Sequence, residues 1–468
     1  MASERASLLI ERQIPVDGAL WEPYSNAGFV GFDTSGMLLP TADVVAEERS
    51  QFYASGRQQN PDLRPRGLDE KALAEQETLA EAYKLTVHDW DGDPGLRQIY
   101  LWRVNENIAN MRMVRAAAAG DDRRFEAYNA FIYGKPRQEV FAGVADELCT
   151  QAEAGLASGH APVREAAARV IDLLGGHRGD RTLLVPPPEV FKRVRDDHLR
   201  AGGYYALLLA GVELPAGLTV VTPDVGDPAL QQVLRNLESD YTLQDAPGAT
   251  WSLKHAQQAV LRPVGYKLPP RRFLGLGAGH EIGTHLLERE NGLRSAVQLL
   301  SSGFDRYELT NEGRAVMREQ VAYDTFEEFA ALPRWQDILR RHLATSLAEG
   351  LAGEPMDFAG VYEIMNAVDV LYETTKKPED PADARRRADN RTWKLLAESI
   401  FKGTDGEHGA YRRYMVYLEG GIDCWRAAAE DPDVISQGDR GKFGITNQRH
   451  RPVLQKYGIL PQAGQEAV

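Results

Sequence analysis

Apolar residues recur every three or four positions over most of the chain, a pattern that predicts amphipathic helices. The clearest case runs from Leu68 to about Ala157 and places Leu101, Val104 and Ile108 on one face. The same periodicity predicts further helices at 163–174, 190–201, 358–372, 391–401 and 411–429. We therefore expect several packed helices and a mainly α-helical protein.

One short segment departs from the helical period. Residues 218–222 (LTVVT) form a β-branched run between Pro215 and Pro223, which is typical of a strand. The fold class we expect is therefore α+β and mainly α-helical, with a small β-sheet.

Glycine and proline divide the chain into three parts. Residues 1–66 alternate short apolar pieces with proline, glycine and asparagine, which predicts an irregular N-terminal arm. Residues 67–180 form a helical region. The Gly/Pro-rich stretch at 175–188 is the best candidate boundary, and residues 181–468 then form a third part, which contains the motif described below.

Composition narrows the class of protein. The 468 residues are 43% hydrophobic and 26% charged, as in ordinary globular proteins. The chain has no apolar run of membrane-spanning length, no basic-then-apolar start and only Cys149 and Cys424, so we expect a cytoplasmic protein without membrane partners. The net charge of −14 argues against nucleic acid as a partner. Heavy use of alanine, arginine and glycine is typical of bacterial proteins.

The chemistry is concentrated at residues 280–285, HEIGTH, where two histidines flank a glutamate. Histidines spaced five apart would lie roughly 140° apart on an ideal α-helix. A wide turn of about 4.4 residues brings them to within roughly 50°, and such π-type turns are frequent at functional sites. Gly283 and Thr284 suit the distortion, since glycine relaxes the backbone and threonine can bond a freed carbonyl. We therefore predict that His280 and His285 bind one metal ion.

A catalytic zinc site needs a third protein ligand and an open position for water. Glu308 and Glu312 both lie at a spacing that suits a ligand on a second helix, and spacing alone does not separate them. Glu288 or Glu290, about one turn after His285, could instead orient a histidine from behind.

Several segments together resemble one known family. They are 272–275 (RFLG), 280–287 (HEIGTHLL) with 291–292 (NG), and 310–316 (TNEGRAV), and the segments 132–136 (IYGKP) and 414–420 (YMVYLEG) add to the likeness. The chain resembles the tyrosine-carboxypeptidase-like zinc metallopeptidases, which include the microtubule-associated tyrosine carboxypeptidases and many bacterial members. The family motif is HExGTH followed by an EGxAV-type segment.

The resemblance implies a zincin-like core in which His280, His285 and Glu312 bind Zn²⁺ and Glu281 is the general base. The small sheet would lie next to the metal-binding helix. Arg314 departs from the family, which usually has leucine there, and nothing in the chain indicates tubulin as a substrate.

These residues predict a zinc-dependent metallocarboxypeptidase that hydrolyses the last bond of a peptide with a free C-terminus. An exopeptidase also needs donors for the terminal carboxylate. The candidates near the motifs are Arg271, Arg272, Arg412, Arg413, Tyr414 and Tyr417. The remaining histidines, among them His255, show no partner at ligand spacing and are interpreted as surface or structural residues.

Three alternatives remain open at this stage. A metal-dependent amide hydrolase in a bacterial biosynthetic pathway would use the same residues. A non-catalytic binding or regulatory protein would keep the metal but would not need Glu281. An iron enzyme that uses oxygen would also take two histidines and a carboxylate, although the interposed glutamate favours hydrolysis.

Overall fold

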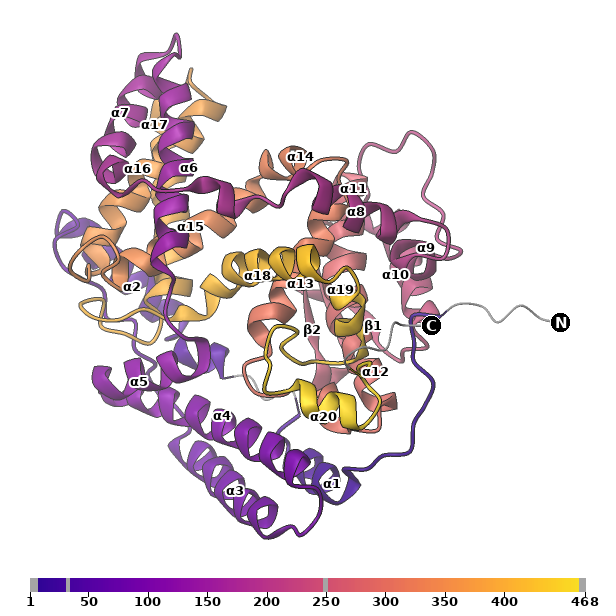
Figure 1. Ribbon diagram of the computed structural model, residues 1–468. Coiled ribbons are helices and arrows are strands. Elements are labelled where there is room, and N and C mark those ends of the chain that lie inside the picture. The colour runs from indigo at the N-terminus through magenta and orange to yellow at the C-terminus, as the bar shows by residue number, and fades with distance from the viewer. Residues whose placement is uncertain (1–6, 31–33, 247–250, 463–468) are drawn as a thin grey trace.

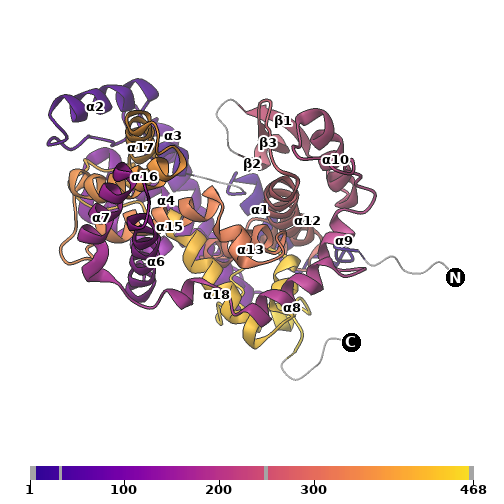
Figure 2. The same cartoon turned by 90° about the horizontal axis from the view of Figure 1, so that it is seen from above.

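Helices dominate the architecture, as the apolar periodicity predicts. The structure is a computed structural model that describes residues 7–30, 34–246 and 251–462. Helices make up 65% of it and the only sheet in these ranges has three strands. Figures 1 and 2 show helices on all sides of a central pair, α13 (Glu308–Val321) and α18 (Val416–Glu430). No helix within these ranges is both long and apolar enough to cross a membrane.

The predicted helical region forms long helices that pack on their neighbours in the chain. They are α3 (Glu70–Asp89), α4 (Pro94–Ala119), α5 (Asp122–Tyr133), α6 (Gln138–Leu156) and α7 (Ala161–Leu174). Aspartates at 69, 93 and 121 cap the first three by accepting a hydrogen bond from a backbone N–H in the first turn. The ends of these helices lie close to the capping aspartates and the glycines in the sequence, because those residues mark where a helix begins and ends.

The predicted N-terminal arm is not irregular throughout. It contains α1 (Gly18–Asn26) and α2 (Ala42–Ala54). Trp21 and Tyr24 of α1 are buried, and the Tyr83 hydroxyl of α3 donates to the Leu20 carbonyl at 2.8 Å. Tertiary packing stabilises α1 although its proline and asparagine are unfavourable for a helix.

Helices from both sides of residue 180 pack together at the upper left of Figure 1. There α6 and α7 contact α15 (Pro333–Ala348) and α16 (Phe358–Lys376), and α17 (Pro381–Leu395) packs on α16. The boundary near 175–188 stays a prediction, because the two segments share one packed helical layer.

The sheet forms from segments other than the predicted strand. Its strands are β1 (Thr242–Ala246), β2 (Ser252–Lys254) and β3 (Ala259–Pro263), in the order β1-β3-β2, with β1 parallel and β2 antiparallel to β3. In the predicted strand at 218–222 only Val221 pairs, as an isolated bridge to Leu268. Without a neighbouring strand, its β-branched residues cannot form a ladder. Strand β2 packs against the helix that carries the histidines.

The remaining elements are shorter and surround the centre. The helices are α8 (Pro188–Leu199), α9 (Tyr204–Leu208), α10 (Pro223–Asn236), α11 (Pro270–Arg272), α12 (Leu287–Arg294), α14 (Phe326–Ala330), α19 (Val434–Gln437) and α20 (Arg451–Lys456). The 3₁₀ and π elements are η1 (Ser35–Leu38), η2 (Gly175–His177), η3 (Arg181–Leu184), η4 (His255–Gln257), η5 (Phe273–Leu286), η6 (Gln298–Ser301), η7 (Leu396–Ile400), η8 (Arg412–Met415) and η9 (Gly438–Arg440).

The central helices α13 and α18 approach each other at two glycines. A Cβ added to Gly420 would fall far inside contact distance of the Leu309 carbonyl, and one added to Gly313 would collide with the backbone of Gly420. A Cβ added to Gly421, the next residue, would meet no atom within 4 Å.

We therefore expect Gly420→Ala to lower the free energy of unfolding by about 1–3 kcal/mol, the usual cost of overpacking. Gly421→Ala is the matched control, and it should be neutral or stabilising by about 0.5–1 kcal/mol because alanine is the better helix former. Denaturant unfolding of both variants measures the difference. Equal stabilities would contradict the close crossing of α13 and α18.

Candidate metal centre

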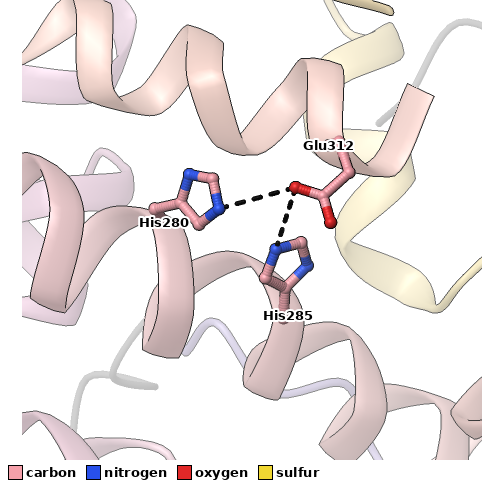
Figure 3. Close-up of side chains that lie close together, drawn as sticks. All are labelled: His280, His285 and Glu312. Atoms are coloured by element: carbon pink, nitrogen blue, oxygen red, sulfur yellow. Dashed lines mark ion pairs between the residues drawn. The ribbon is translucent and has the colours of Figure 1, made fainter. Parts of the chain in front are cut away.

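The two histidines of the motif lie on η5, which is a π-helix from Phe273 to Leu286. The wide turn that their spacing requires is therefore confirmed. Their ring centroids are 5.0 Å apart with an interplanar angle of 80°. The π-helix thus brings both imidazoles to the same side of the helix, facing α13 (Figure 3).

Small residues in η5 allow the helix to pack tightly against α9. A Cβ at Gly279 would lie 2.6 Å from the Tyr205 hydroxyl, and one at Gly283 would collide with the Tyr204 hydroxyl. The Thr284 hydroxyl donates to the Gly279 carbonyl at 2.9 Å, as predicted for a threonine in a widened turn. These glycines are therefore explained by packing against two tyrosines as well as by backbone freedom.

A buried arginine holds the end of the π-helix. The Leu287 N–H donates to the carbonyl of Ile282, five residues back, and α12 then begins with the four-residue spacing of an α-helix. Such a change of register is expected to leave one carbonyl of this turn without its usual backbone donor. Nη1 of Arg318 donates to the carbonyl of Gly283 at 2.9 Å. Arg318 therefore stabilises the backbone between the two histidines.

Helix α13 supplies the third group that faces the histidines. Oε2 of Glu312 lies 3.6 Å from Nε2 of His280 and 3.7 Å from Nε2 of His285 (Figure 3). Glu308, the other candidate from the sequence, instead pairs with Nε of Arg413 at 3.2 Å. The structure therefore separates the two glutamates that spacing left equivalent.

The geometry of these three groups fits a divalent cation. Ligand atoms bound at about 2.0–2.1 Å in a tetrahedral site lie roughly 3.3 Å apart, close to the observed separations. Oε2 of Glu312 is buried and accepts no hydrogen bond, so it is oriented toward the histidines without another partner. Burial would raise the pKa of Glu312, but the two imidazoles hold it well below its usual range. An ionised carboxylate beside two imidazoles is a donor set that suits zinc.

Glu281 lies beside this group without completing it. Its Oε1 is 3.9 Å from Nε2 of His280, and the side chain lines the same cavity. Burial raises the pKa of the Glu281 carboxyl. The residue between the histidines is thus placed to exchange a proton with a group held in the cavity.

Sequence reasoning missed a second carboxylate that supports the site. Oε1 of Glu319 lies 2.7 Å from Nδ1 of His280, and Arg334 donates to both oxygens of Glu319 at 3.0 and 3.2 Å. Burial would lower the pKa of His280, but the neighbouring carboxylates of Glu312 and Glu319 raise it to about 10. Glu319 is seven residues after Glu312, two helical turns along the same face, so this spacing could have identified it.

The two residues suggested for that supporting role have other partners. Glu288 is fully buried and accepts from Nη1 of Arg314 at 2.6 Å, and Glu290 pairs with Arg289 at 3.1 Å. Neither contacts a histidine of the motif among the described residues. The orienting group comes from α13 because that helix, and not α12, faces the imidazole Nδ1 of His280.

His280, His285 and Glu312, called the metal-facing groups below, line a cavity of about 450 Å³. Three of the six substrate-binding candidates from the sequence line it, namely Arg413, Tyr414 and Tyr417. Arg272 does not line this cavity. Two further arginines weighed from the sequence are paired elsewhere, Arg271 with Glu328 at 2.7 Å and Arg412 with Glu349 at 2.7 Å.

Two more cavity residues were not found from the sequence. His255 of η4 and Lys442, which follows η9, line the wall with the metal-facing groups. Nε2 of His255 lies 3.2 Å from Nζ of Lys442, and burial lowers the pKa of His255 to about 2. His255 has no ligand-type neighbour in sequence, so only the fold could bring it here.

Another set of ligand-type side chains lies outside this cavity. Asp122, Asp405 and His408 each offer an atom within 4.8 Å of the others, but they are more exposed than the residues of the motif. Exposed groups of this kind are well solvated and need no cation.

Because Glu312 faces both imidazoles and Glu308 does not, Glu312→Ala should abolish tight binding of a divalent cation, whereas Glu308→Ala should keep it. Elemental analysis of the purified variants measures this directly. Metal retained in Glu312→Ala and lost in Glu308→Ala would reverse the assignment of the third ligand.

Glu319→Gln should weaken cation binding by about 10–100-fold, the usual effect of losing a carboxylate behind a ligating histidine. Competition with a chelator gives the affinity. Glu328→Gln is the matched control, because Glu328 pairs with Arg271 on the surface and should not change the affinity. An unchanged affinity in Glu319→Gln would mean that His280 is oriented by other contacts.

No protein-family model, curated protein or solved structure matches this chain in the comparisons made. The resemblance to the tyrosine-carboxypeptidase-like peptidases therefore depends on the motifs quoted above and stays a prediction. What the structure adds is independent of any relative. It brings His280, which is buried, together with His285 and Glu312, which are half-buried, in a group that lines a cavity.

Proposed function

We propose that this protein is a zinc-dependent metallopeptidase with a zincin-like core, acting as a carboxypeptidase. One observation carries the proposal. Glu281 lines the same cavity as His280, His285 and Glu312 but is not one of the three facing groups. A purely structural zinc site closes its fourth position with a protein ligand and needs no such carboxylate.

Two imidazole nitrogens and one carboxylate oxygen are a usual ligand set of catalytic zinc, with one position open. A zinc ion held by His280, His285 and Glu312 would polarise a carbonyl and make a bound water more acidic. Glu319 would fix the ring of His280 through Nδ1, so that Nε2 points at the ion.

Glu281 is the residue that handles the proton. Its carboxylate would accept a proton from the attacking water and deliver it to the nitrogen of the leaving amine. The peptide bond breaks between the carbonyl carbon and that nitrogen, and the two products are a new carboxylate and a free amine. Burial in the cavity keeps bulk water from competing for this proton.

Other residues that line the cavity offer hydrogen-bond donors for the substrate. Burial, together with the nearby Glu312 carboxylate, raises the pKa of Tyr417, so its hydroxyl stays protonated and able to donate. Arg413 and Tyr414 line the same cavity. These groups suit a peptide whose carbonyl oxygen and C-terminal end need hydrogen-bond donors.

The proposed substrate is a peptide, or a peptide-like amide from a bacterial biosynthetic pathway, with a free C-terminus. Both share the amide bond that the site would hydrolyse. The test incubates zinc-loaded protein with a pool of peptides that differ at their last residue and identifies released amino acids by mass spectrometry. Release of an amino acid favours the peptide as the substrate.

Glu281→Gln should keep about one zinc per chain and reduce turnover of any cleaved peptide by about 10²–10⁴-fold, the range for loss of a general base. Zinc is measured by elemental analysis, with His285→Ala as the variant that should lose it. Glu290→Gln, outside the cavity lining, is the control and should keep both zinc and turnover.

Two results would contradict the proposal. Zinc content that His285→Ala leaves unchanged would place the metal elsewhere. Full turnover in Glu281→Gln would remove the proposed base and favour a different chemistry for the same cavity.

A further inference from the structure

The ammonium group of Lys442 has no ion-pair partner among the described residues, although it lies deep in the protein. Lys442 is only 5% exposed to solvent. No carboxylate of the described residues lies within 4.0 Å of its Nζ, where an ion pair would be counted, and its hydrogen-bond partner is the imidazole of His255. Burial lowers the pKa of Lys442 to about 8.

The buried arginines of the described chain provide the contrast. Each has a carboxylate partner, as in the pairs Arg103–Glu106 at 2.8 Å and Arg314–Glu288 at 2.6 Å. A buried charge without a partner is costly, and proteins normally pair it. The exception at Lys442 therefore indicates a group whose partner comes from outside the chain.

His255 orients this ammonium without neutralising it. The Tyr241 hydroxyl lies 2.7 Å from Nδ1 of His255, on the opposite side of the ring from Lys442. The imidazole is neutral because burial and the neighbouring Lys442 disfavour its charged form. Nε2 of His255 therefore accepts one hydrogen bond from the ammonium, and the remaining two N–H donors of Lys442 are left for other acceptors.

The backbone fixes the position of Lys442 on both sides. Its N–H donates to the Leu300 carbonyl at 2.8 Å, and its carbonyl accepts from the Phe304 N–H at 2.9 Å. The side chain lines two adjoining cavities, the metal-facing one and an extension of about 260 Å³ that also includes Tyr133 and Ser302. The ammonium thus lies where the two cavities meet.

We propose that Lys442, oriented by His255, binds a carboxylate group of the substrate at the junction of the metal-facing cavity and its extension. The inference rests on the proposed function only for the identity of the substrate as a peptide. Two free N–H donors on a fixed ammonium match the two oxygens of one carboxylate. That carboxylate is the C-terminal group of the peptide or an acidic side chain at its last residue.

The test uses three pools of N-acetylated dipeptides and the full-length protein. The first pool has a free C-terminal carboxylate and uncharged side chains, the second has the same sequences amidated, and the third is amidated with Asp or Glu as the last residue. Retention by metal-free protein and by the zinc-loaded Glu281→Gln variant is measured by ultrafiltration and mass spectrometry. Neither the metal-free protein nor the Glu281→Gln variant is expected to hydrolyse the peptides, so retention by these two forms measures anion binding and not catalysis.

We expect at least one carboxylate pool to be retained about 10–100-fold better than the amidated neutral pool. This is the affinity ratio that a hydrogen bond to a charged group contributes. Lys442→Met should remove this preference. Lys254→Met is the matched control, because Lys254 lines the same cavity but is exposed, and it should largely keep the preference. Retention of the first pool identifies the terminal carboxylate, and retention of the third identifies the side chain.

Equal retention of all three pools, or an unchanged preference in Lys442→Met, would overturn the proposal. Failure of the proposed function has a different signature, because a protein without zinc or hydrolysis would still show Lys442-dependent retention in its metal-free form.

A stability measurement excludes a purely structural role. Removing an unpaired buried charge should raise the melting temperature of the ligand-free protein in both Lys442→Met and Lys442→Gln. A lower melting temperature in both variants would mean that Lys442 holds the fold together, which would count against a substrate-binding role.

Discussion

The hydrogen bond from Arg318 to the carbonyl of Gly283 is the contact on which the candidate metal centre depends. Histidines five residues apart face one point only if the helix between them widens, and a widened helix must change register when it resumes the α-helical spacing. That change leaves one buried carbonyl without a donor, which is costly unless a side chain supplies one. Arg318 lies on α13, which also carries Glu312 and Glu319. One helix therefore stabilises the π-helix, faces both histidines and orients His280.

Arg318 is itself held by a network of buried charges. Asp439 of η9 pairs with both Arg318 and Arg314, and Arg314 also pairs with Glu288 of α12. This network gives a physical reason for the arginine at position 314, where the family that the motifs resemble usually has leucine. An isolated buried arginine would be costly, but two carboxylates compensate Arg314 and link α12, α13 and the segment after α19. Replacement of Arg314 by an apolar residue would leave Glu288 short of a partner.

The side chains that line the cavity distribute charge unevenly. Glu281 and Glu312 lie at the metal-facing side, whereas Arg413 and Lys442 belong to the rest of the wall. Arg413 is compensated by Glu308, and Lys442 by no described carboxylate within ion-pair distance. The positive character of that wall is thus concentrated on a single buried ammonium.

The sequence by itself determined the helical class of the fold, the wide turn at residues 280–285 and the histidines as a pair, because periodicity, capping residues and spacing are local properties of the chain. It also narrowed the third facing group to Glu308 and Glu312, which lie four apart on one helix and so share a face. Only the tertiary structure decided between them, since the answer depends on how α13 packs against α18 and η5. The same holds for His255 and Lys442, which come from segments far apart in the chain and have no local signature. Local patterns record what one helix or turn requires, whereas the packing of distant segments decides which side chains meet.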